Sequence, residues 1–390
     1  MAAGSTLPVL ISGAGLASLL FAQSLRRSKI PFVIFERDKS VSFRGQGYRL
    51  RLSSEGLQAV KDVVGPEEYE RFYEICGKTS GGGMQKYNAV TGERMDDDAE
   101  QRIAPGTAQT IGIARGDLRK FLMEGCEDDI QWGKTVKSYE LVEDGVFAVF
   151  ADGEKSTKGS LLVAGDGISS TIAKQVSDGR LKVFDTGARG IHGQAPTTAF
   201  KDIGEGVFSF TDKRADNHTM SCITNVRSGD KDDPTKEFGF TIIASPGLIK
   251  APGDNYSLVG EPAARLAQDL TSNWNKRFKP IFDQINVDQA AFWKITCSTE
   301  TGVPEWDNVP RVTVIGDAAH SVTPAGGLGA NTAMQDSALL GKLLAQNGGY
   351  ADGITAEYEK EMRKYASEVV KKSYGLANES LGVGPLKNEL

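Results

Sequence analysis

Histidine and cysteine are scarce in this chain of 390 residues, which contains three histidines and four cysteines. With so few imidazoles, we expect no histidine-rich metal site. The cysteines are far apart and none forms a Cys-x-x-Cys pair, so neither a metal knot nor a redox dithiol is expected. Scattered cysteines of this kind are typical of a reducing compartment.

An excess of basic residues is also absent, because 45 Lys and Arg face 51 Asp and Glu, for a net charge of −6. The sequence therefore predicts neither general affinity for nucleic acid nor a polybasic membrane patch. No apolar run approaches the length of a membrane span and no signal peptide is evident, so we expect a cytoplasmic protein. For the same reason we interpret the match of residues 387–390 to an endoplasmic-reticulum retention signal as chance.

Near its start the chain contains a short apolar strand, residues 9–11, followed at once by glycines. Helical periodicity then runs to about residue 28, Pro31 prevents its continuation, and a second apolar strand occupies residues 32–35. Glu36 ends this strand. The order strand, glycine turn, helix, strand and acid predicts a βαβ unit that binds a dinucleotide.

The residues of this unit have distinct expected roles. Gly13 permits the tight turn, Gly15 lets a pyrophosphate approach the backbone, and the helix N-terminus attracts that anion. Ser18 replaces the third glycine of the fingerprint, and Glu36 has the spacing expected for a carboxylate on ribose hydroxyls. The alternative is a glycine-rich turn that only packs helix on strand. The motif does not choose between FAD and a nicotinamide.

Several arginines are further candidates for cofactor binding. Arg37 follows Glu36, and Arg44 and Gly47 belong to a basic, glycine-containing loop that leads into an expected strand. A solvated basic strand edge is an equal alternative for that loop. Arg115 begins an expected helix, where the helix dipole disfavours a cation. A nearby anion would account for it, and so would simple exposure to solvent.

The rest of the chain divides by composition. Residues 77–112 are rich in Gly, Asp and Thr and are expected to form an excursion from the first domain. Alternating runs after residue 200 predict a mostly antiparallel sheet, and residues 263–278 predict a helix. We expect an α/β fold with a discontinuous, Rossmann-like domain, a second β-sheet domain and a C-terminal helical segment. The expected boundaries are 1–178, 179–300, 301–345 and 346–390.

Two later stretches repeat the pattern of a buried strand followed by glycine and aspartate. One ends in Gly-Asp-Gly at residues 165–167 and the other in Gly-Asp-Ala-Ala-His at residues 316–320, followed by a glycine-rich loop over residues 324–331. With the first turn, this order resembles class A flavoprotein monooxygenases, the single-chain aromatic hydroxylases similar to para-hydroxybenzoate hydroxylase and salicylate hydroxylase. The resemblance spans residues 8–345 and is weakest over 180–300.

The resemblance implies that the conserved positions of the family bind FAD. Glu36 would hold the adenosine ribose, and Arg115 would bond the cofactor near its pyrophosphate or ribityl chain. Asp166 would lie near the pyrophosphate and be linked to NADPH use, and Asp317 would take the ribityl hydroxyls, with a simple cap after a strand as its alternative. The loop would aim backbone N–H groups at the charge of the reduced flavin from Gly327, Leu328, Gly329, Ala330 and Asn331.

The same resemblance implies a reaction. NADPH or NADH reduces FAD, and a C4a-hydroperoxyflavin then passes oxygen to an electron-rich carbon. We therefore expect a monooxygenase that hydroxylates or epoxidises an aromatic or polycyclic small molecule of secondary-metabolite type. Its partners would be that substrate and molecular oxygen. The oligomeric state, the choice of nicotinamide and the identity of the substrate stay open.

Residues 186–196 resemble the strand by which this family enters its substrate sheet. Many relatives have tryptophan and arginine where Ile191 and His192 fall, so a group that titrates near neutrality replaces a permanent cation. His192 is thus a candidate hydrogen-bond partner or base for a phenol or neutral polycycle. Arg189, on the opposite face of a regular strand, could still supply a cation. A strand histidine without a catalytic part is the alternative.

Two other functions fit parts of this pattern. One is a related flavoprotein that does not insert oxygen, such as a prenyl-chain reductase or a halogenase. The four tryptophans are isolated, so the halogenase-type Trp-x-Trp-x-Ile-Pro pattern is missing. The other is a flavin-binding module that signals redox state, although no charged tail supports it. Substrate-accelerated NADPH oxidation, with oxygen found in the product, would distinguish these functions.

Overall fold

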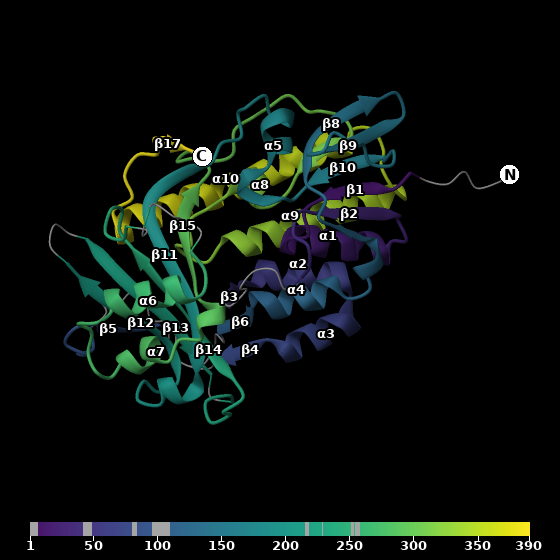
Figure 1. The fold of residues 1–390 in the computed structure, drawn as a ribbon. Helices are drawn as coiled ribbons and strands as arrows, with labels where there is room; N and C mark the ends of the chain where they lie inside the picture. Colours follow the sequence, from purple (N-terminus) through teal and green to yellow (C-terminus); the bar gives the residue numbers. More distant parts are fainter. Residues whose placement is uncertain are drawn as a thin grey trace.

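The two larger β-sheets of the described residues lie on opposite sides of the molecule, and the long helices α9 and α10 run between them (Figure 1). The structure is a computed structural model that describes residues 7–41, 49–79, 84–95, 110–214, 218–227, 229–250, 253 and 258–390. The predicted α/β class, with one parallel and one mostly antiparallel sheet, is confirmed.

The first sheet has five parallel strands in the order β16-β10-β1-β2-β7. Three of its strands are buried along their whole length, as their apolar runs predict. Because parallel strands end at the same edge, the loops after β1, β2, β10 and β16 meet there. The bounds are β1 (Val9–Ser12), β2 (Phe32–Glu36), β7 (Ile130–Trp132), β10 (Leu161–Ala164) and β16 (Val312–Val314).

Helices pack against this sheet and against one another. Helix α9 contacts α1, α2 and α10, so it lies at the centre of the helical layer (Figure 1). The helix bounds are α1 (Leu16–Arg27), α2 (Ser54–Val64), α3 (Pro66–Ile75), α4 (Arg115–Met123), α5 (Thr171–Val176), α8 (Asp317–His320), α9 (Gly329–Asn347) and α10 (Ile354–Leu381). Strands β8 (Val136–Val142) and β9 (Gly145–Phe150) form an antiparallel hairpin.

A small sheet and a large one complete the fold. Strands β3 (Arg49–Leu52), β6 (Thr110–Ala114) and β4 (Gly77–Thr79) form the small one. The large sheet has the order β15-β11-β14-β13-β12-β5, with β17 paired to β11, and is antiparallel except between β12 and β5. Its strands are β5 (Met84–Asn88), β11 (Phe184–Pro196), β12 (Gly206–Lys213), β13 (Thr219–Val226), β14 (Glu237–Ala244), β15 (Ala291–Cys297) and β17 (Asn388–Glu389).

One face of the large sheet is covered by its own hydrophobic core. Phenylalanines of β12 and β14 pack there against α6 (Glu261–Leu270) and α7 (Lys279–Asp283). The helix predicted over residues 263–278 is wrong, because α6 ends at Leu270. The chain then turns so that Trp274 is buried and its Nε1 donates to Asp212 at 3.2 Å.

The described parts of the predicted excursion join two different sheets. Strands β4 and β6 pair within the small sheet, whereas β5 pairs with β12 of the large one. The C-terminal tail is also more ordered than expected, since β17 pairs with the start of β11. Among the described residues, none of the helices has the length and apolarity that crossing a bilayer requires. Nor do those residues include a His, Cys, Asp and Glu cluster able to hold a metal ion.

Candidate active site

The turn after β1 shows which of its glycines the protein itself requires. Gly13 has a φ of 90°, and a Cβ there would lie 2.8 Å from Cα of Asp166. Gly15 has an ordinary φ of −77°, and the nearest atom to a Cβ would be the carbonyl oxygen of Gly165 at 3.6 Å. Packing and backbone geometry therefore explain why residue 13 must be glycine, but they do not explain the glycine at residue 15. A group that approaches the turn from outside would explain Gly15.

The first turn of α1 is well suited to an anion. No side chain caps it, and it contains no acidic residue. Its backbone N–H groups and partial positive charge are thus available to a phosphate. Ser18 is fully buried in this helix, and its Oγ donates to the carbonyl of Gly165 at 3.4 Å. Ser18 thus fills the helix–strand packing position, and its side chain has no surface left for a cofactor.

Glu36 lies at the end of β2, directly beside this turn. Its Oε2 accepts a hydrogen bond from the backbone N–H of Ala14 at 2.7 Å, and its Oε1 accepts one from Asp38 at 2.9 Å. Arg119 of α4 lies next to it, with Nη2 4.0 Å from Oε2 and Nε donating to the carbonyl of Ala14 at 3.1 Å. Nothing in the sequence marks Arg119 as a site residue, because a buried arginine in a helix has no local signature.

Asp166 lies after β10 on the other side of the turn. Ser12 donates to its Oδ2 at 3.1 Å. Burial raises the pKa of this carboxyl, and hydrogen bonds from Ser170 and Ser12 act in the opposite direction. Arg37 follows Glu36 at the end of β2, at the sheet edge where β10 also ends.

Asp317 begins α8 after β16. Its side chain is exposed to solvent, yet the protein around it is dense enough to raise the pKa of its carboxyl. The charges of His320 and Arg115 act in the opposite direction on that pKa. Contacts between α8 and the turn at Gly167–Ser169 place Asp317 beside Asp166.

The glycine-rich loop leads from α8 into α9. Gly327 has a φ of 64°, and its N–H donates to the carbonyl of Pro324 at 3.0 Å. Asn331 ties this loop to a distant segment, because its amide donates to Arg51 and Gly327 and accepts from the N–H of Ser53. Its side chain is fully engaged, so Asn331 shapes the loop. The first turn of α9, after Leu328, has no side-chain cap and no acidic residue, and includes Gly329 and Ala330.

The register of the large sheet shows where His192 faces. In β11, His192 pairs with Thr241 and Ala291, whereas Ile191 pairs with Ile242 and Phe292 of the aromatic core. Paired residues share a face and successive residues alternate, so His192 lies on the face opposite that core. Burial and the charge of Arg115 lower its pKa to about 4. The charge of Arg115, at the start of α4, thus acts on the pKa of both His192 and Asp317.

The prediction that Arg189 supplies a substrate cation is not supported by its geometry. Arg189 makes a two-pronged ion pair with Asp185, at 2.7 and 3.1 Å, where β11 is irregular. Lys294 lies 3.5 Å from the same carboxylate. The guanidinium is on the face opposite His192 and is occupied in fixing the strand.

Trp293 of β15 is a site candidate that no sequence motif marks. It shares the face of His192, because it pairs with Gly190 two residues earlier in β11. A Cβ at Gly190 would lie 2.5 Å from the indole, so the glycine makes room for it. In the described part of the chain, its Nε1 is buried without a hydrogen-bond partner. Only cross-strand register could have revealed this pairing.

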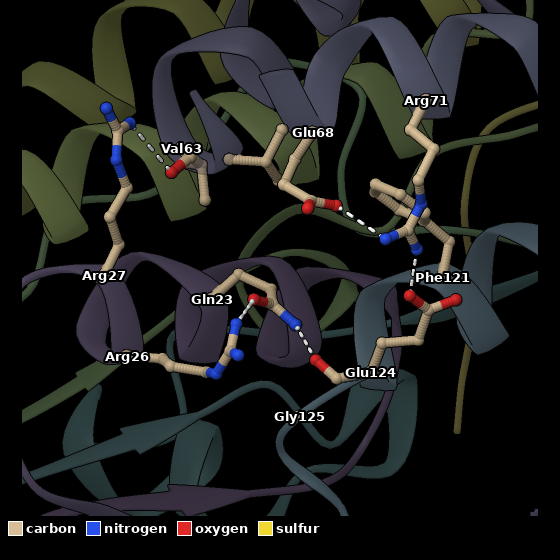
Figure 2. Close-up of a pocket in the computed structure, with 10 residues that line it drawn as sticks. Gln23, Arg26, Arg27, Val63, Glu68, Arg71, Phe121, Glu124 and Gly125 are labelled. Atoms are coloured by element: carbon tan, nitrogen blue, oxygen red, sulfur yellow. Dashed lines mark hydrogen bonds and ion pairs between the residues drawn. The ribbon is translucent and has the colours of Figure 1, made fainter. Parts of the chain in front are cut away.

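A groove of about 420 Å³ lies elsewhere, between the C-terminal ends of α1 and α4 (Figure 2). Arg71 pairs there with Glu68 at 3.1 Å and with Glu124, and Arg27 donates to the carbonyl of Val63 at 3.2 Å. Both helices direct their N-termini to the opposite side, at Gly15 and Arg115. This groove is therefore separate from the site at the strand ends.

The comparisons with known proteins agree with this geometry. A family model described as an FAD binding domain matches residues 258–373. The dual O-methyltransferase/FAD-dependent monooxygenase of Cercospora beticola is 30% identical over 405 residues, which cover 94% of this chain and 45% of the relative. This chain spans less than half of the length of the curated relatives that it matches first.

Solved structures share the whole fold. A crystallised protein of Photorhabdus luminescens, named as an FAD-containing monooxygenase, has a TM-score of 0.76 and 26% identity over 96% of this chain and 99% of its own. A salicylate hydroxylase solved with its substrate has a TM-score of 0.73 over 98% of this chain and 90% of its own, at 18% identity. In sequence and in fold the chain is similar to class A flavin monooxygenases, as its motifs predicted.

The residues present fit FAD. Gly15 lies at an uncapped helix N-terminus without an acidic residue, and Asp317 offers a solvent-exposed carboxylate at the same edge of the sheet. Arg44 and Gly47, also predicted to bind the cofactor, lie outside the described residues. For the remaining predicted residues, contact with the cofactor stays a proposal.

Proposed function

We propose that this chain is an FAD-dependent monooxygenase that uses NADPH or NADH and molecular oxygen to hydroxylate or epoxidise an aromatic or polycyclic small molecule. The observation that carries this proposal is the convergence of Gly15, Glu36, Asp166 and Asp317 at one edge of the parallel sheet. They follow β1, β2, β10 and β16, which lie side by side, and α8 contacts the turn after Asp166. FAD, when bound and reduced, supplies the activation of oxygen.

The chain's part in this chemistry is to hold the cofactor. The N-terminus of α1, opened by Gly15, would bind the pyrophosphate, and Glu36 would turn from the N–H of Ala14 to the ribose hydroxyls. Asp317 would accept hydrogen bonds from the ribityl chain. The uncapped N-terminus of α9 would face the end of the flavin that becomes negatively charged on reduction.

The substrate would lie between the flavin and the face of the large sheet opposite its aromatic core. That face carries His192 and Thr241, with Ile243 and Trp293 beside them. Because the pKa of His192 is near 4, the imidazole is neutral at pH 7 and suits a hydrogen bond better than proton abstraction. With Arg189 bound to Asp185, this face favours a phenol or neutral polycycle over a simple carboxylate.

The relative from Cercospora beticola supports a phenolic substrate or product. Its name joins an O-methyltransferase to the monooxygenase, and a phenolic oxygen is a group that an O-methyltransferase can methylate. Both activities would then act on the same class of compound.

The test is a screen of hydroxylated naphthalenes and anthraquinones for faster NADPH oxidation by the FAD-loaded protein. Products are then analysed by mass spectrometry under labelled oxygen gas. One labelled oxygen atom in the product is the expected result. Stimulated NADPH oxidation with a reduced or halogenated product free of label would instead assign a flavoprotein that does not insert oxygen.

A further inference from the structure

Asp336 is a fully buried carboxylate near the middle of α9, and three groups from other elements converge on it. Its Oδ2 accepts the backbone N–H of Gly316 at 2.7 Å and lies 2.6 Å from Nε2 of His320. Its Oδ1 accepts the hydroxyl of Tyr365, in α10, at 2.6 Å. A carboxylate is costly to bury, so such complete use of its oxygens calls for a reason.

Gly316, the first of these partners, lies in a turn where any other residue would be strained. Its φ is 62°, and a Cβ there would lie 3.2 Å from that of Ala17 and 3.4 Å from that of Ala333. This residue immediately precedes Asp317. The hydrogen bond from its N–H to Asp336 therefore fixes the peptide that determines where the Asp317 side chain points.

His320, the second partner, balances the charge. Burial opposes a charge on His320, but the carboxylate of Asp336 raises its pKa overall. Burial raises the pKa of Asp317, and the negative charge of Asp336 adds to that effect, whereas His320 lowers the pKa. The pair therefore places a second carboxylate near Asp317 while offsetting the effect of its charge.

We propose that Asp336 is a positioning residue of the cofactor site. From within α9 it binds Gly316 and His320, so that the peptide before Asp317 and the glycine loop at the start of α9 are held against the same turn. This inference rests on the proposed binding of FAD. Asp336 lies outside both the Gly-Asp-Ala-Ala-His motif and the glycine-rich loop, so neither motif predicts this role.

The test is to titrate the apoprotein of each variant with FAD and to measure its thermal unfolding. Asp336→Asn keeps the size of the side chain but directs an amide at donors, so we expect the FAD dissociation constant to rise about tenfold or more. Tyr365→Phe leaves Gly316 and His320 in place and should change it by less than about threefold.

Tyr358→Phe is the matched structural control. Tyr358 is fully buried in α10, and its hydroxyl donates to the carbonyl of Val314 at 3.1 Å, two residues before Gly316. This variant should lower the melting temperature without weakening FAD. If Asp336→Asn and Tyr358→Phe weaken FAD in proportion to their lost stability, or if Asp336→Asn binds FAD like the wild type, the proposal is overturned.

His320→Gln keeps a donor for Asp336 but removes the charge, and it serves if Asp336→Asn does not fold. The charged groups acting on Asp317 are then Arg115 of α4 and Asp336 of α9. We expect FAD binding to weaken with acidification at a higher pH than in the wild type, because Asp317 is protonated more easily. An unchanged pH profile would contradict the charge balance. A wild type that binds no FAD at all would instead refute the proposed function.

Discussion

A single carboxylate, that of Asp317, gives the most direct test of the cofactor site. Asp317→Ala removes an acceptor for the ribityl hydroxyls, and charge-assisted hydrogen bonds of this kind contribute about 1.5–3 kcal/mol. The FAD dissociation constant should therefore rise about tenfold to hundredfold, measured by quenching of flavin fluorescence on titration. Asp307→Ala, at another exposed aspartate, is the control and should leave the value unchanged. Equal affinity in both variants would exclude Asp317 from the site.

His192 gives a residue-scale prediction that needs neither cofactor nor substrate. Its pKa is lowered from 6.5 to about 4 in the folded protein, so the native state favours the neutral ring. The unfolded chain takes up the proton below pH 6.5, so the stability that His192 contributes is complete above that pH and is lost as the pH falls toward 4. The loss approaches about 1.4 kcal/mol per pH unit.

The measurement compares denaturant unfolding of the apoprotein at pH 7 and pH 5, for the wild type and His192→Gln. The variant should lose less free energy of unfolding between the two pH values than the wild type does. If both lose the same amount, His192 is not held neutral within the fold.

At the scale of elements, the two glycines of the turn between β1 and α1 have different expected roles, Gly13 in stability and Gly15 in cofactor binding. Gly13→Ala should destabilise the apoprotein by at least about 1–2 kcal/mol, because alanine is strained at positive φ and meets Asp166 as well. Gly15→Ala should cost the apoprotein at most about 1 kcal/mol, because its Cβ makes only ordinary contact, yet should weaken FAD strongly. Thermal unfolding and FAD titration of both variants give the comparison. A Gly15→Ala protein with full FAD affinity would argue against a pyrophosphate at this turn.

Local elements of this fold were predictable because their signals are local. Strands β1 and β2 and the turn between them follow from apolar runs and glycines within a few residues. The helix over 263–278 failed, because burial of Trp274 on Asp212 overrides the helical pattern. Helix α10 runs on to Leu381 where its pattern weakens, since its last turns pack on the large sheet.

The candidate site was predictable only where a motif marks it. The glycines, Glu36, Asp166 and Asp317 lie in recognisable patterns. The role of Asp336 depends on partners in the turn after β16, in α8 and in α10. No sequence pattern near Asp336 predicts these contacts. The irregularity that pairs Arg189 with Asp185 is likewise a property of the folded sheet. The proposed domain boundaries are not tested by these contacts and stay predictions.

At the scale of the whole molecule, the C-terminal tail joins parts that are distant in the chain. Val383 is fully buried beside α10 and the large sheet, and β17 extends the edge of β11. Removing residues 383–390 should therefore lower the melting temperature of the apoprotein, since burial of a valine alone contributes about 1.5–3 kcal/mol. Lys387→Ala, at an exposed position of the same tail, should have little effect. An unchanged melting temperature after truncation would show that the tail is dispensable.

The place of β16 has a consequence for how this protein is made. This strand pairs with β10, from which about 150 residues separate it, and the loop that follows it carries Asp317. During synthesis, β1, β10 and all strands of the large sheet except β17 emerge before the ribosome has produced β16. Long-range pairing of this kind is slow and leaves an open strand edge meanwhile. A cofactor held by Asp317 would thus bind only after β16 and α8 have been made.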